Sequence, residues 1–382
     1  MRDLKELRSE IDKLDRQITD LFSRRMDCSK EVGEYKKSHN IPILNEEREK
    51  EILNRIEKEG GEYGTFSRLL YSNIMQLSRE VQHDIVSSGA LLRNEIASAP
   101  GTVPTENITI AVQGIKGANS HEAAMSIFGE NADIAFFNSF ASVFNAIENE
   151  TADFGVLPVE NSSAGSVSDV YDLILRHRFY IIDALDLRID HCLCGLKQST
   201  AEDIEYVWSH PQALAQCSNF INENNLQAIP YPNTAVAAKE IFREKRLNCA
   251  ALCSEVAAKE YGLKILKKDF QNNRANTTRF IVISKKLYIP PDACKISLCF
   301  SLPHVTGSLY TVLCRFNSLG LNLTKIESRP MDSKYFDYLF YLDFTGNVSD
   351  KRVLSLLCAL SVELPEFSFF GNYNERKAEP KK

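Results

Sequence analysis

The sequence predicts a multidomain protein that joins an all-α segment, an α/β segment and an α+β segment. Three observations lead to this expectation. In the first 93 positions, apolar residues recur every three or four residues, as in helices packed along a seam. From Ile108 onward, short strand-like apolar runs alternate with helical patterns. After Pro290-Pro291 the expected order is β-α-β-β-α-β, the split unit of ferredoxin-like domains.

Residues 1–93 are expected to form a unit of three helices without strands. The first helix has a coiled-coil-like seam and must break near Pro42, because proline cannot continue a helix. The second covers about 46–58 and ends at Gly60-Gly61. The third carries an apolar stripe over 66–85 at helical spacing.

Residues 94–107 contain two prolines and several small polar residues, which predicts an extended, mobile linker. Residues 108–285 are predicted to form α/β layers with mostly parallel sheets. Strands are expected at 108–112, 133–137, 153–158, 179–184, 204–208, 249–252 and 278–284. Helices are expected at 120–128, 140–149, 167–177, 211–223, 234–244 and 254–261.

Residues 294–374 are predicted to form the α+β domain. Its strands are expected at 295–302, 321–330, 336–345 and 367–373, and its helices at 307–318 and 350–361. Residues 377–382 are expected to be a frayed tail.

Composition excludes several classes of protein. The 382 residues include 45 Lys plus Arg and 51 Asp plus Glu, and the resulting net charge of −6 gives no electrostatic footprint for nucleic acid. The N-terminus is charged and amphipathic, which predicts no secretory signal, and no stretch approaches the ~18 apolar residues of a membrane span. Ten irregularly spaced cysteines without a zinc-type partner set predict buried thiols and no metal site. We therefore expect a cytoplasmic protein.

Arg25 occupies a seam position of the first helix where Leu or Ile is expected. A buried guanidinium must be paired with an anion, because an unpaired one is strongly unfavourable. Further polar residues are expected near the same helical core: Lys36, Arg48, Glu49, Ser78 and Gln82. A single arginine in a seam is more often a structural ion pair, but this set together indicates a pocket for a small polyanion.

Arg8 is too far away to join that pocket. On a straight helix it lies about 25 Å from Arg25, at ~1.5 Å per residue. If Arg8 is functional, it serves a pocket in a partner chain, which predicts an interlocked dimer.

Several motifs in this segment occur in a known order: Leu7-Arg8-x-x-Ile11, Arg24-Arg25, Val32-Gly33-x-x-Lys36, Glu47-Arg48-Glu49 and Ser78-x-x-x-Gln82. The segment thereby resembles the all-helical chorismate mutase family. The resemblance implies rearrangement of chorismate to prephenate. It implies that Arg25, Arg48 and Arg8 of the partner subunit hold the carboxylates, with help from Ser78. It also implies that Lys36 and Gln82 face the ether oxygen and that Glu49 holds the ring hydroxyl.

Polar loops follow several of the α/β strands. They cover 113–122, 160–166 and 209–217, and a further candidate segment covers 276–280. Ligands gather at the carboxyl ends of strands in open α/β sheets, so these loops form the expected site. Taken singly, each is more simply explained by turn and capping residues.

Together, five motifs in these loops and strands resemble prephenate dehydratase: Gly-x-Lys-Gly-x-x-Ser-His, Pro-Val-Glu-Asn-Ser-x-x-Gly, Ile-Asp-His-Cys, Ser-His-Pro-Gln-x-x-x-Gln-Cys and Thr-Arg-Phe. The resemblance implies two lobes like those of a periplasmic binding protein, with the site in the cleft between them. The implied reaction removes carbon dioxide and water from prephenate to give phenylpyruvate, without a cofactor.

Within that resemblance, Thr278 is assigned to the leaving hydroxyl, either as an acid or as a hydrogen-bond donor alone. Asn161, Ser209 and Gln216 would position the substrate. Glu160 would contact substrate or hold its own loop. Arg279 would pair with a substrate carboxylate or with a core acid such as Glu160.

The last segment carries Gly307-Ser308-Leu309 and Glu327-Ser328-Arg329-Pro330. Beside a dehydratase segment, both motifs resemble those of ACT regulatory domains. The resemblance implies that phenylalanine binds at an interface between two such domains and inhibits the enzyme. Gly307 would admit the amino acid and Leu309 would pack on its ring.

The leading hypothesis is therefore a bifunctional chorismate mutase and prephenate dehydratase under phenylalanine control, assembled as a homodimer or homotetramer. One alternative is an arogenate dehydratase activity in the second domain. From a different class, a non-catalytic amino-acid sensor remains possible, although it leaves the cations of 1–93 unexplained. A fused prephenate dehydrogenase is disfavoured, since it requires a nicotinamide-binding fingerprint that the sequence lacks.

Overall fold

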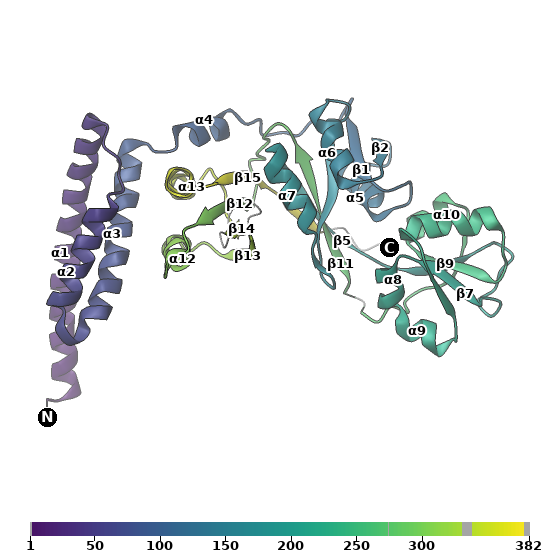
Figure 1. Ribbon diagram of the computed structural model, residues 1–382, viewed down its shortest axis with the longest axis horizontal. Coiled ribbons are helices and arrows are strands. Elements are labelled where there is room, and N and C mark those ends of the chain that lie inside the picture. The colour runs from purple at the N-terminus through teal and green to yellow at the C-terminus, as the bar shows by residue number, and fades with distance from the viewer. Residues whose placement is uncertain (1, 274, 331–337, 378–382) are drawn as a thin grey trace. The chain divides into compact units, whose positions relative to one another are not determined.

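The computed structural model describes residues 2–273, 275–330 and 338–377 (Figure 1). The chain falls into two compact units. One contains Met1–Ser98 and Leu298–Phe369, and the other contains Ala99–Ser297 and Phe370–Lys382. Across the described residues, no helix combines the length and the apolar character that a membrane span requires.

The N-terminal segment contains the three expected helices, α1 (Leu4–His39), α2 (Glu46–Glu59) and α3 (Gly64–Val86), with a 3₁₀ turn at Gly61–Tyr63. Helix α1 ends at Asn40 in the left-handed conformation, just before Pro42. The side chain of Asn45 caps α2 by accepting from the backbone N–H of Arg48 at 3.0 Å. Both α1 and α2 pack against α3.

The close approach of α1 and α3 depends on Gly33, which is buried. A Cβ atom there would lie 3.3 Å from both Cα and Cγ of Gln82 and 3.1 Å from Cδ1 of Ile85. Because these contacts are tighter than normal packing distances, glycine sets the spacing of the two helices beside Gln82.

A fourth helix corrects the predicted linker. Helix α4 covers Ala90–Ser98, so residues 94–98 are helical rather than extended. Leu92 and Ile96 are one turn apart and both are buried. Tertiary packing of this pair, against α13 (Lys351–Glu363), outweighs the small polar residues that follow.

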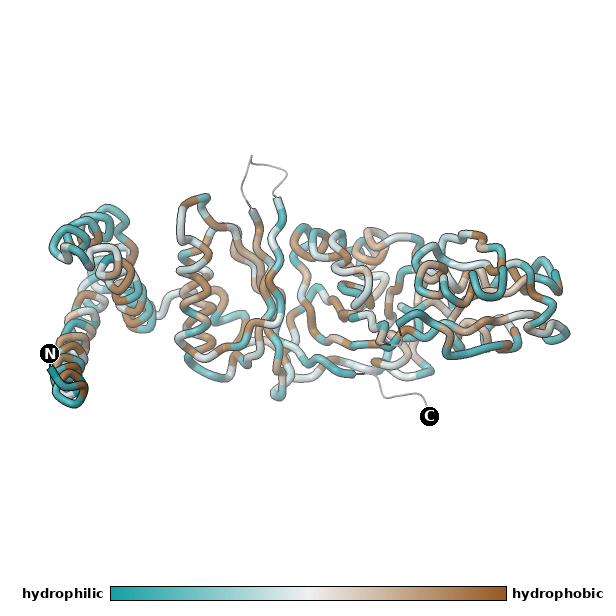
Figure 2. Tube along the Cα trace, turned by 90° about the horizontal axis from the view of Figure 1, so that it is seen from below, coloured by the Kyte–Doolittle hydropathy of each residue, from teal (hydrophilic) through white to brown (hydrophobic). Residues whose placement is uncertain are grey.

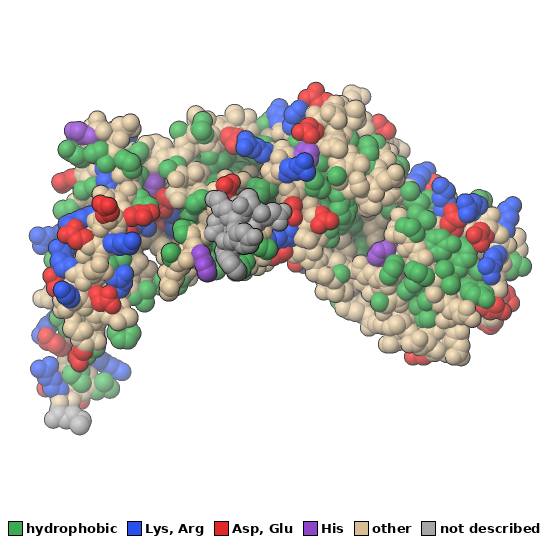
Figure 3. Space-filling model, viewed as in Figure 1, with side chains coloured by type: hydrophobic (Ala, Val, Ile, Leu, Met, Phe, Trp, Pro, Cys, Tyr) green, Lys and Arg blue, Asp and Glu red, His purple; other side chains and the backbone are tan. Residues whose placement is uncertain are grey.

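Much of the apolar face of α1 is uncovered within one chain. The exposed side chains include Leu4, Leu7, Ile11, Leu14, Ile18 and Leu21, at 40–60% exposure. Figure 2 shows teal and brown residues interleaved along the N-terminal helices, and Figure 3 shows charged side chains of both signs beside apolar ones on their visible face. A long, regularly spaced apolar face of this kind is typical of a surface that packs against another element.

The α/β segment consists of two sheets, each flanked by helices. The first has the order β16-β5-β11-β3-β1-β2, with β4 beside β3. Its strands are β1 (Thr109–Gln113), β2 (Asp133–Phe137), β3 (Phe154–Asn161), β4 (Gly165–Ser166), β5 (Tyr180–Arg188), β11 (Thr277–Ser284) and β16 (Glu375–Lys377). Its helices are α5 (Asn119–Phe128), α6 (Phe140–Glu148) and α7 (Ser168–His177).

The second sheet has the order β10-β6-β9-β7-β8. Its strands are β6 (Cys192–Gly195), β7 (Tyr206–Ser209), β8 (Gln227–Pro230), β9 (Cys249–Cys253) and β10 (Lys264–Lys267). Its helices are α8 (Pro211–Gln216), α9 (Ser218–Glu223), α10 (Thr234–Glu244) and α11 (Glu255–Glu260). The chain leaves the first sheet after β5 and returns at β11, which divides the segment into two lobes.

The sheets are mixed, so the expectation of mostly parallel sheets is wrong. Strand β1 runs parallel to β2 and β3, but β11 runs antiparallel to both β3 and β5. In the second sheet, β6 is antiparallel to β9 and β10. These antiparallel strands are the ones that lead the chain from one lobe to the other and back.

The C-terminal segment forms a four-stranded sheet in the order β13-β14-β12-β15. Its elements are β12 (Lys295–Leu302), α12 (Ser308–Ser318), β13 (Leu323–Pro330), β14 (Tyr338–Thr345), α13 and β15 (Ser368–Tyr373). This confirms the predicted β-α-β-β-α-β order. The first two residues of the strand expected at 336–345 lie outside the described residues.

The chain then adds a strand that the sequence did not predict. Lys377, expected in a frayed tail, is the last residue of β16, which pairs in parallel with β5. Arg376 in this strand forms an ion pair of 2.5 Å with the buried Asp183. The rest of the expected tail, 378–382, lies outside the described residues.

Candidate active sites

A cavity of about 600 Å³ opens between α1, α2 and α3. It is lined by six of the seven residues that the sequence singled out in this segment: Arg25, Lys36, Arg48, Glu49, Ser78 and Gln82. They come from three helices, and they meet because each lies on the face turned toward the other two. The expectation of one shared polar pocket is therefore met by the geometry.

Several of these side chains are held by the chain itself. Arg25 donates through Nη1 to the hydroxyl of Ser78, which in turn donates to the carbonyl of Ile74 at 2.8 Å. Gln82 donates through Nε2 to the carbonyl of Ser78 at 3.2 Å, while its Oε1 is buried without a partner among the described residues. An unsatisfied buried amide oxygen beside a cavity is a group that a ligand or water can complete.

The electrostatics of the cavity are dominated by cations. Burial lowers the pKa of Lys36, the charge of Arg79 lowers it further, and Glu49 opposes the change by raising it. The Lys36 ammonium donates to the carbonyl of Ile43 at 2.5 Å. Such a site favours a small anion that can neutralise it.

Arg79 also lines this cavity, and the sequence reasoning missed it. Its Nη1 donates to Oε1 of Glu49. The available signal was its position, one residue after Ser78 and three before Gln82, although nothing in the spacing distinguishes it from a surface arginine.

Arg8 does not line the cavity. It lies on the same unbroken helix as Arg25, 17 residues nearer the N-terminus, which is about 25 Å at ~1.5 Å per residue. Within a single chain, Arg8 therefore cannot contact the same small ligand as Arg25 in this cavity.

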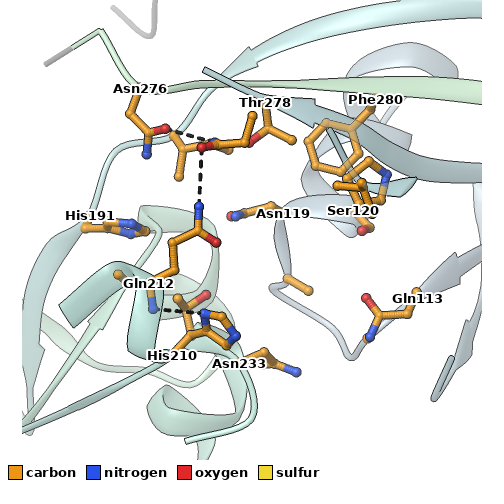
Figure 4. A pocket seen from close by; sticks show the side chains of 18 of the residues that line it. Gln113, Asn119, Ser120, His191, His210, Gln212, Asn233, Asn276, Thr278 and Phe280 are labelled. Atoms are coloured by element: carbon orange, nitrogen blue, oxygen red, sulfur yellow. Dashed lines mark hydrogen bonds between the residues drawn. The ribbon is translucent and has the colours of Figure 1, made fainter. Parts of the chain in front are cut away.

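A second cavity, of about 230 Å³, lies in the other unit and is lined by residues from both lobes. From the first lobe come Gln113, Asn119, Ser120, Asn161 and Thr278. From the second come His210, Gln212, Gln216, Asn233 and Thr234. Figure 4 shows Thr278 and Asn276 near Gln212 and His191, with Asn119 and Ser120 on the other side.

Asn161 is the centre of a hydrogen-bonded network. Its Oδ1 accepts from the backbone N–H groups of Ser163 and Ala164, both at 3.0 Å, and from Nε2 of Gln212 at 3.3 Å. This directs its Nδ2 to Oγ1 of Thr278 and to Oδ1 of Asn276, each at 2.9 Å. Asn161 and Thr278 are cross-strand neighbours of β3 and β11, so the sheet register fixes this contact.

The network leaves two donors facing the cavity. Thr278 accepts from Asn161, so its own hydroxyl hydrogen is available to another acceptor. Gln216 accepts through Oε1 from Asn276 at 3.0 Å and meets Nε2 of His191 at 3.1 Å. Its Nε2 is buried without a partner among the described residues.

The described residues that line this cavity contribute no formal charge. Among the described residues that line it there is no Lys, Arg, Asp or Glu. Burial lowers the pKa of His210, and burial also lowers that of His191 although the hydrogen bond to Gln216 raises it. Both shifts favour the neutral imidazole, and the polar lining consists of these rings with hydroxyl, amide and backbone groups.

Three residues predicted for substrate lie elsewhere. Ser209 is fully buried and its hydroxyl donates to the carbonyl of Leu252 at 2.6 Å, which joins β7 to β9. Arg279 donates to both carboxylate oxygens of Asp186, at 2.8 and 3.1 Å, and lies 3.7 Å from Glu160. Of the two alternatives left open for Arg279, this geometry matches pairing with core acids, and neither Glu160 nor Arg279 lines the cavity.

The sequence reasoning also missed part of the lining. Asn233 and Thr234 begin α10, where Asn233 accepts from the N–H of Val236 at 2.7 Å. The signal was a Pro-Asn-Thr sequence ahead of a helix, a normal capping pattern that reveals nothing of the cavity. His210 and Gln212 fell within a quoted motif without an assigned role.

The C-terminal motifs are exposed or partly exposed. Gly307 has φ +87° and immediately precedes Ser308 and Leu309, the first residues of α12. Along β13, Glu327 and Arg329 turn toward one face, where Arg329 pairs with Glu327 at 2.9 Å. Residues 326, 328 and 330, which include Ser328 and Pro330, turn to the exposed face.

The described residues contain no group of three or more His, Cys, Asp or Glu arranged to hold a metal ion. Burial raises the pKa values of Cys192 and Cys217 to about 12, so neither thiol is activated as a nucleophile.

Comparisons with known proteins match both segments of the chain in which the cavities lie. Residues 7–83 match chorismate mutase type II, and residues 110–287 match prephenate dehydratase. The chain is 34% identical over 377 residues to a bifunctional chorismate mutase/prephenate dehydratase of Aquifex aeolicus, with 98% of each chain covered.

Two further similarities cover about seven-tenths of this chain. An arogenate dehydratase/prephenate dehydratase of Arabidopsis thaliana is 38% identical over 296 residues, covering 73% of this chain and 74% of the relative. The solved structure of a prephenate dehydratase from Arthrobacter aurescens in complex with L-Phe is 29% identical, with a TM-score of 0.64. It covers 70% of this chain and 89% of that one.

Proposed function

Because the chain belongs to the family of bifunctional chorismate mutase/prephenate dehydratases, we propose that its two cavities are the two active sites. It is an enzyme of phenylalanine biosynthesis with both activities. The observation that carries the assignment is the contrast between the cavities. One is lined by four cations and one carboxylate, and the other by neutral donors.

The helical cavity suits the rearrangement of chorismate. The substrate carries two carboxylates, which Arg25 and Arg48 would hold, with Ser78 assisting through its contact with Arg25. As the C–O bond breaks, negative charge develops on the ether oxygen. Lys36 and the second N–H of Gln82 would donate to that oxygen. Glu49 would accept from the ring hydroxyl and so fix the orientation of the ring.

Arg8 would complete this site from a second copy of the chain. The exposed apolar face of α1, which includes Leu14 and Ile18, is the surface along which two copies would associate. Running side by side in opposite directions, two such helices bring Arg8 of each copy near the other copy's cavity. We therefore assign an interlocked homodimer, alone or within a homotetramer.

The two-lobed cavity suits the loss of carbon dioxide and water from prephenate. Thr278 would donate its free hydroxyl hydrogen to the leaving ring hydroxyl, while Asn161 holds the threonine oxygen at 2.9 Å. A threonine hydroxyl is a poor general acid at neutral pH, so its contribution is a hydrogen bond. Gln216 would donate through its unpartnered Nε2 to the substrate.

Backbone groups would replace cations as partners of the substrate carboxylates. Helices α5 and α10 both begin at this cavity, with Asn119, Ser120, Asn233 and Thr234 in its lining. The first turn of α5 has no side-chain cap, since Ala118 precedes it. Free N–H groups and the positive end of the helix dipole favour an anion at such a place.

Feedback control is assigned to the C-terminal segment as an ACT-type domain. Its strand order matches the split β-α-β-β-α-β unit. The related dehydratase of Arthrobacter aurescens is described in complex with L-Phe. Gly307, in a backbone conformation that favours glycine, would let the amino acid approach α12, where Leu309 packs on its ring. The strand Glu327–Pro330 would form the interface with a second copy.

The substrate of the second step is prephenate rather than arogenate in this assignment. The two differ by an amino group in place of a keto oxygen. Since the described residues that line the cavity include no carboxylate to pair with an ammonium, its chemistry favours the keto acid. The Arabidopsis relative carries both names, so a comparison of kcat/KM for the two substrates decides the point.

A coupled assay tests the whole assignment with purified protein. Chorismate should be converted to phenylpyruvate without an added cofactor, and L-phenylalanine should slow the second step. Arg25→Ala should abolish the first step only, and Thr278→Ala the second only. If either single change removes both activities from a folded protein, the two cavities are not separate active sites. A protein that binds L-phenylalanine without converting either substrate would instead be an amino-acid sensor.

A further inference from the structure

Arg79 lies between two carboxylates that come from different parts of the chain. Its Nη1 donates to Glu49 of α2 inside the helical cavity, and its Nε lies 3.8 Å from Oε1 of Glu363, the last residue of α13. The side chains of Arg79 and Glu363 are only 13% and 12% exposed. All three residues belong to the same compact unit.

Glu363 is itself held from several sides. His83 approaches the same oxygen through Nε2, and Arg315 of α12 donates through Nη1 to the other oxygen at 2.7 Å. The Nε of Arg315 lies 3.2 Å from Glu80 on α3. An alternating series of acids and guanidinium groups therefore runs from the cavity into the two C-terminal helices.

The charge state of Glu363 is fixed by these partners. Burial alone would raise its pKa, but the hydrogen bond with His83 and the charges of Arg315 and Arg79 outweigh it and lower the pKa to about 2. Glu363 is therefore an anion at neutral pH, and it offers Arg79 a constant partner on the side away from the cavity.

This arrangement pairs two charges that would otherwise interfere with substrate binding in the cavity. An unrestrained Glu49 would repel the carboxylates of an anionic substrate, and an unrestrained Arg79 would compete for them. Glu363 lies at the Nε edge of the Arg79 guanidinium, so the Nη1 edge points at Glu49. The charges of Arg79 and Glu49 therefore neutralise each other before substrate binds. Preorganised charge of this kind is what an electrostatic catalyst requires.

We propose that Arg79 and Glu363 are positioning residues for the mutase reaction, with Glu363 fixing Arg79 and Arg79 fixing Glu49. The C-terminal domain would thus supply part of the framework of the mutase site. The inference rests on the assignment of the helical cavity to the mutase. Neither residue is among the motifs that carry the resemblance to chorismate mutases.

The test measures kcat and KM for both reactions in full-length variants. Glu363→Gln should lower mutase kcat/KM about tenfold, a normal coupling for residues in direct contact, and leave the dehydratase rate within about twofold. Glu366→Gln removes the same charge from an exposed position three residues later and should change neither rate. Unchanged dehydratase activity reports that the two-lobed unit of each variant is folded, and an unchanged far-UV circular dichroism spectrum reports the same for the helices of the other unit.

Two further comparisons separate positioning from packing. Arg79→Met keeps an unbranched side chain but not its charge, whereas Arg79→Lys keeps the charge. Arg79→Lys should retain most of the mutase activity that Arg79→Met loses. In the Arg79→Met background, Glu363→Gln should cause no additional loss, because Glu363 acts through Arg79.

Three results would overturn the proposal. Glu363→Gln could have the same mutase kcat/KM as Glu366→Gln, or its loss of mutase activity could multiply with the loss caused by Arg79→Met. The third is that Arg79→Met and Arg79→Lys have equal mutase activity. Arg25→Ala distinguishes these failures from an error in the site itself. If Arg25→Ala keeps mutase activity, the cavity is not the mutase site. If it is inactive while Glu363→Gln behaves as wild type, only the inference about Glu363 fails.

Discussion

Replacing Thr278 by valine tests the assignment of the dehydratase site most directly. Valine has nearly the same shape as threonine, so the change removes a hydroxyl without opening a large cavity. In the structure, that hydroxyl accepts from Nδ2 of Asn161 and leaves its own hydrogen free for a ligand. Thr278→Val therefore deletes the donor proposed for the leaving hydroxyl and one acceptor of Asn161.

The cost to stability and the cost to catalysis are expected to differ. Nδ2 of Asn161 keeps Asn276 as a partner at 2.9 Å, so no donor group becomes fully unsatisfied. The free energy of unfolding should fall by only about 1 kcal/mol, the usual size for one hydrogen bond. A preorganised donor to a group that gains negative charge is worth ~3 kcal/mol in the transition state, so kcat should fall ~10²-fold or more.

The assay measures phenylpyruvate formation from prephenate, with chorismate consumption by the same protein as the internal control. Thr278→Ser restores a hydroxyl and should recover most of the lost rate. The mutase rate should be unchanged in both variants. A dehydratase rate for Thr278→Val within about threefold of wild type would refute the role of this hydroxyl, as would equal inactivity of the serine and valine variants in folded protein.

The remaining predictions concern the helical unit. Gly33→Ala places a Cβ 3.3 Å from two atoms of Gln82, so it should shift that side chain and lower mutase kcat ~10-fold without affecting the dehydratase; an unchanged mutase rate would show that the helix spacing is not critical. Ile18→Glu puts a charge on the apolar face of α1, which should weaken the dimer in analytical ultracentrifugation and lower mutase activity ~100-fold, whereas Leu91→Glu, at an 89% exposed position, should do neither. Because the pKa of Glu363 is lowered to about 2, its stabilisation is present above the unfolded pKa near 4.5 and is lost as pH falls toward 2. Between pH 7 and pH 3, the free energy of unfolding measured with denaturant should fall by about 2 kcal/mol more in wild type than in Glu363→Gln. Equal decreases in the two proteins would contradict the pairing of Glu363.

Much of the fold follows from periodicity in the sequence. Helical spacing predicts α1, α2 and α3, and the β-α-β-β-α-β order of the C-terminal segment is confirmed. The failures share a cause. Helix α4 and strand β16 are short elements whose stability comes from packing against distant residues, as with Arg376 and Asp183. A local pattern holds no information about such partners.

The same limit explains which site residues could be predicted. Arg25 stands out because a cation on an apolar seam violates the local pattern. Lys36 lies near the same helix face, and both residues line the cavity. Arg79 fits the local helical pattern, so the sequence does not single it out. Its contacts with Glu49 and Glu363 become visible only in the folded structure. Ser209 shows the reverse error, because a serine within a specific motif is used here to join two strands rather than to line the cavity.

The opposite electrostatic characters of the two cavities follow from the two reactions. In the rearrangement both carboxylates remain on the molecule while charge grows on an ether oxygen, so fixed cations such as Arg25 and Lys36 stabilise the transition state. In the second reaction one carboxylate leaves as carbon dioxide and gives up its charge. A cation beside that carboxylate would stabilise the ground state more than the transition state and would slow its loss. A neutral lining with a donor such as Thr278 at the leaving hydroxyl avoids that penalty. In the proposed assignment, prephenate is formed in a cationic pocket and consumed in a neutral one, and each environment would be poorly suited to the other step.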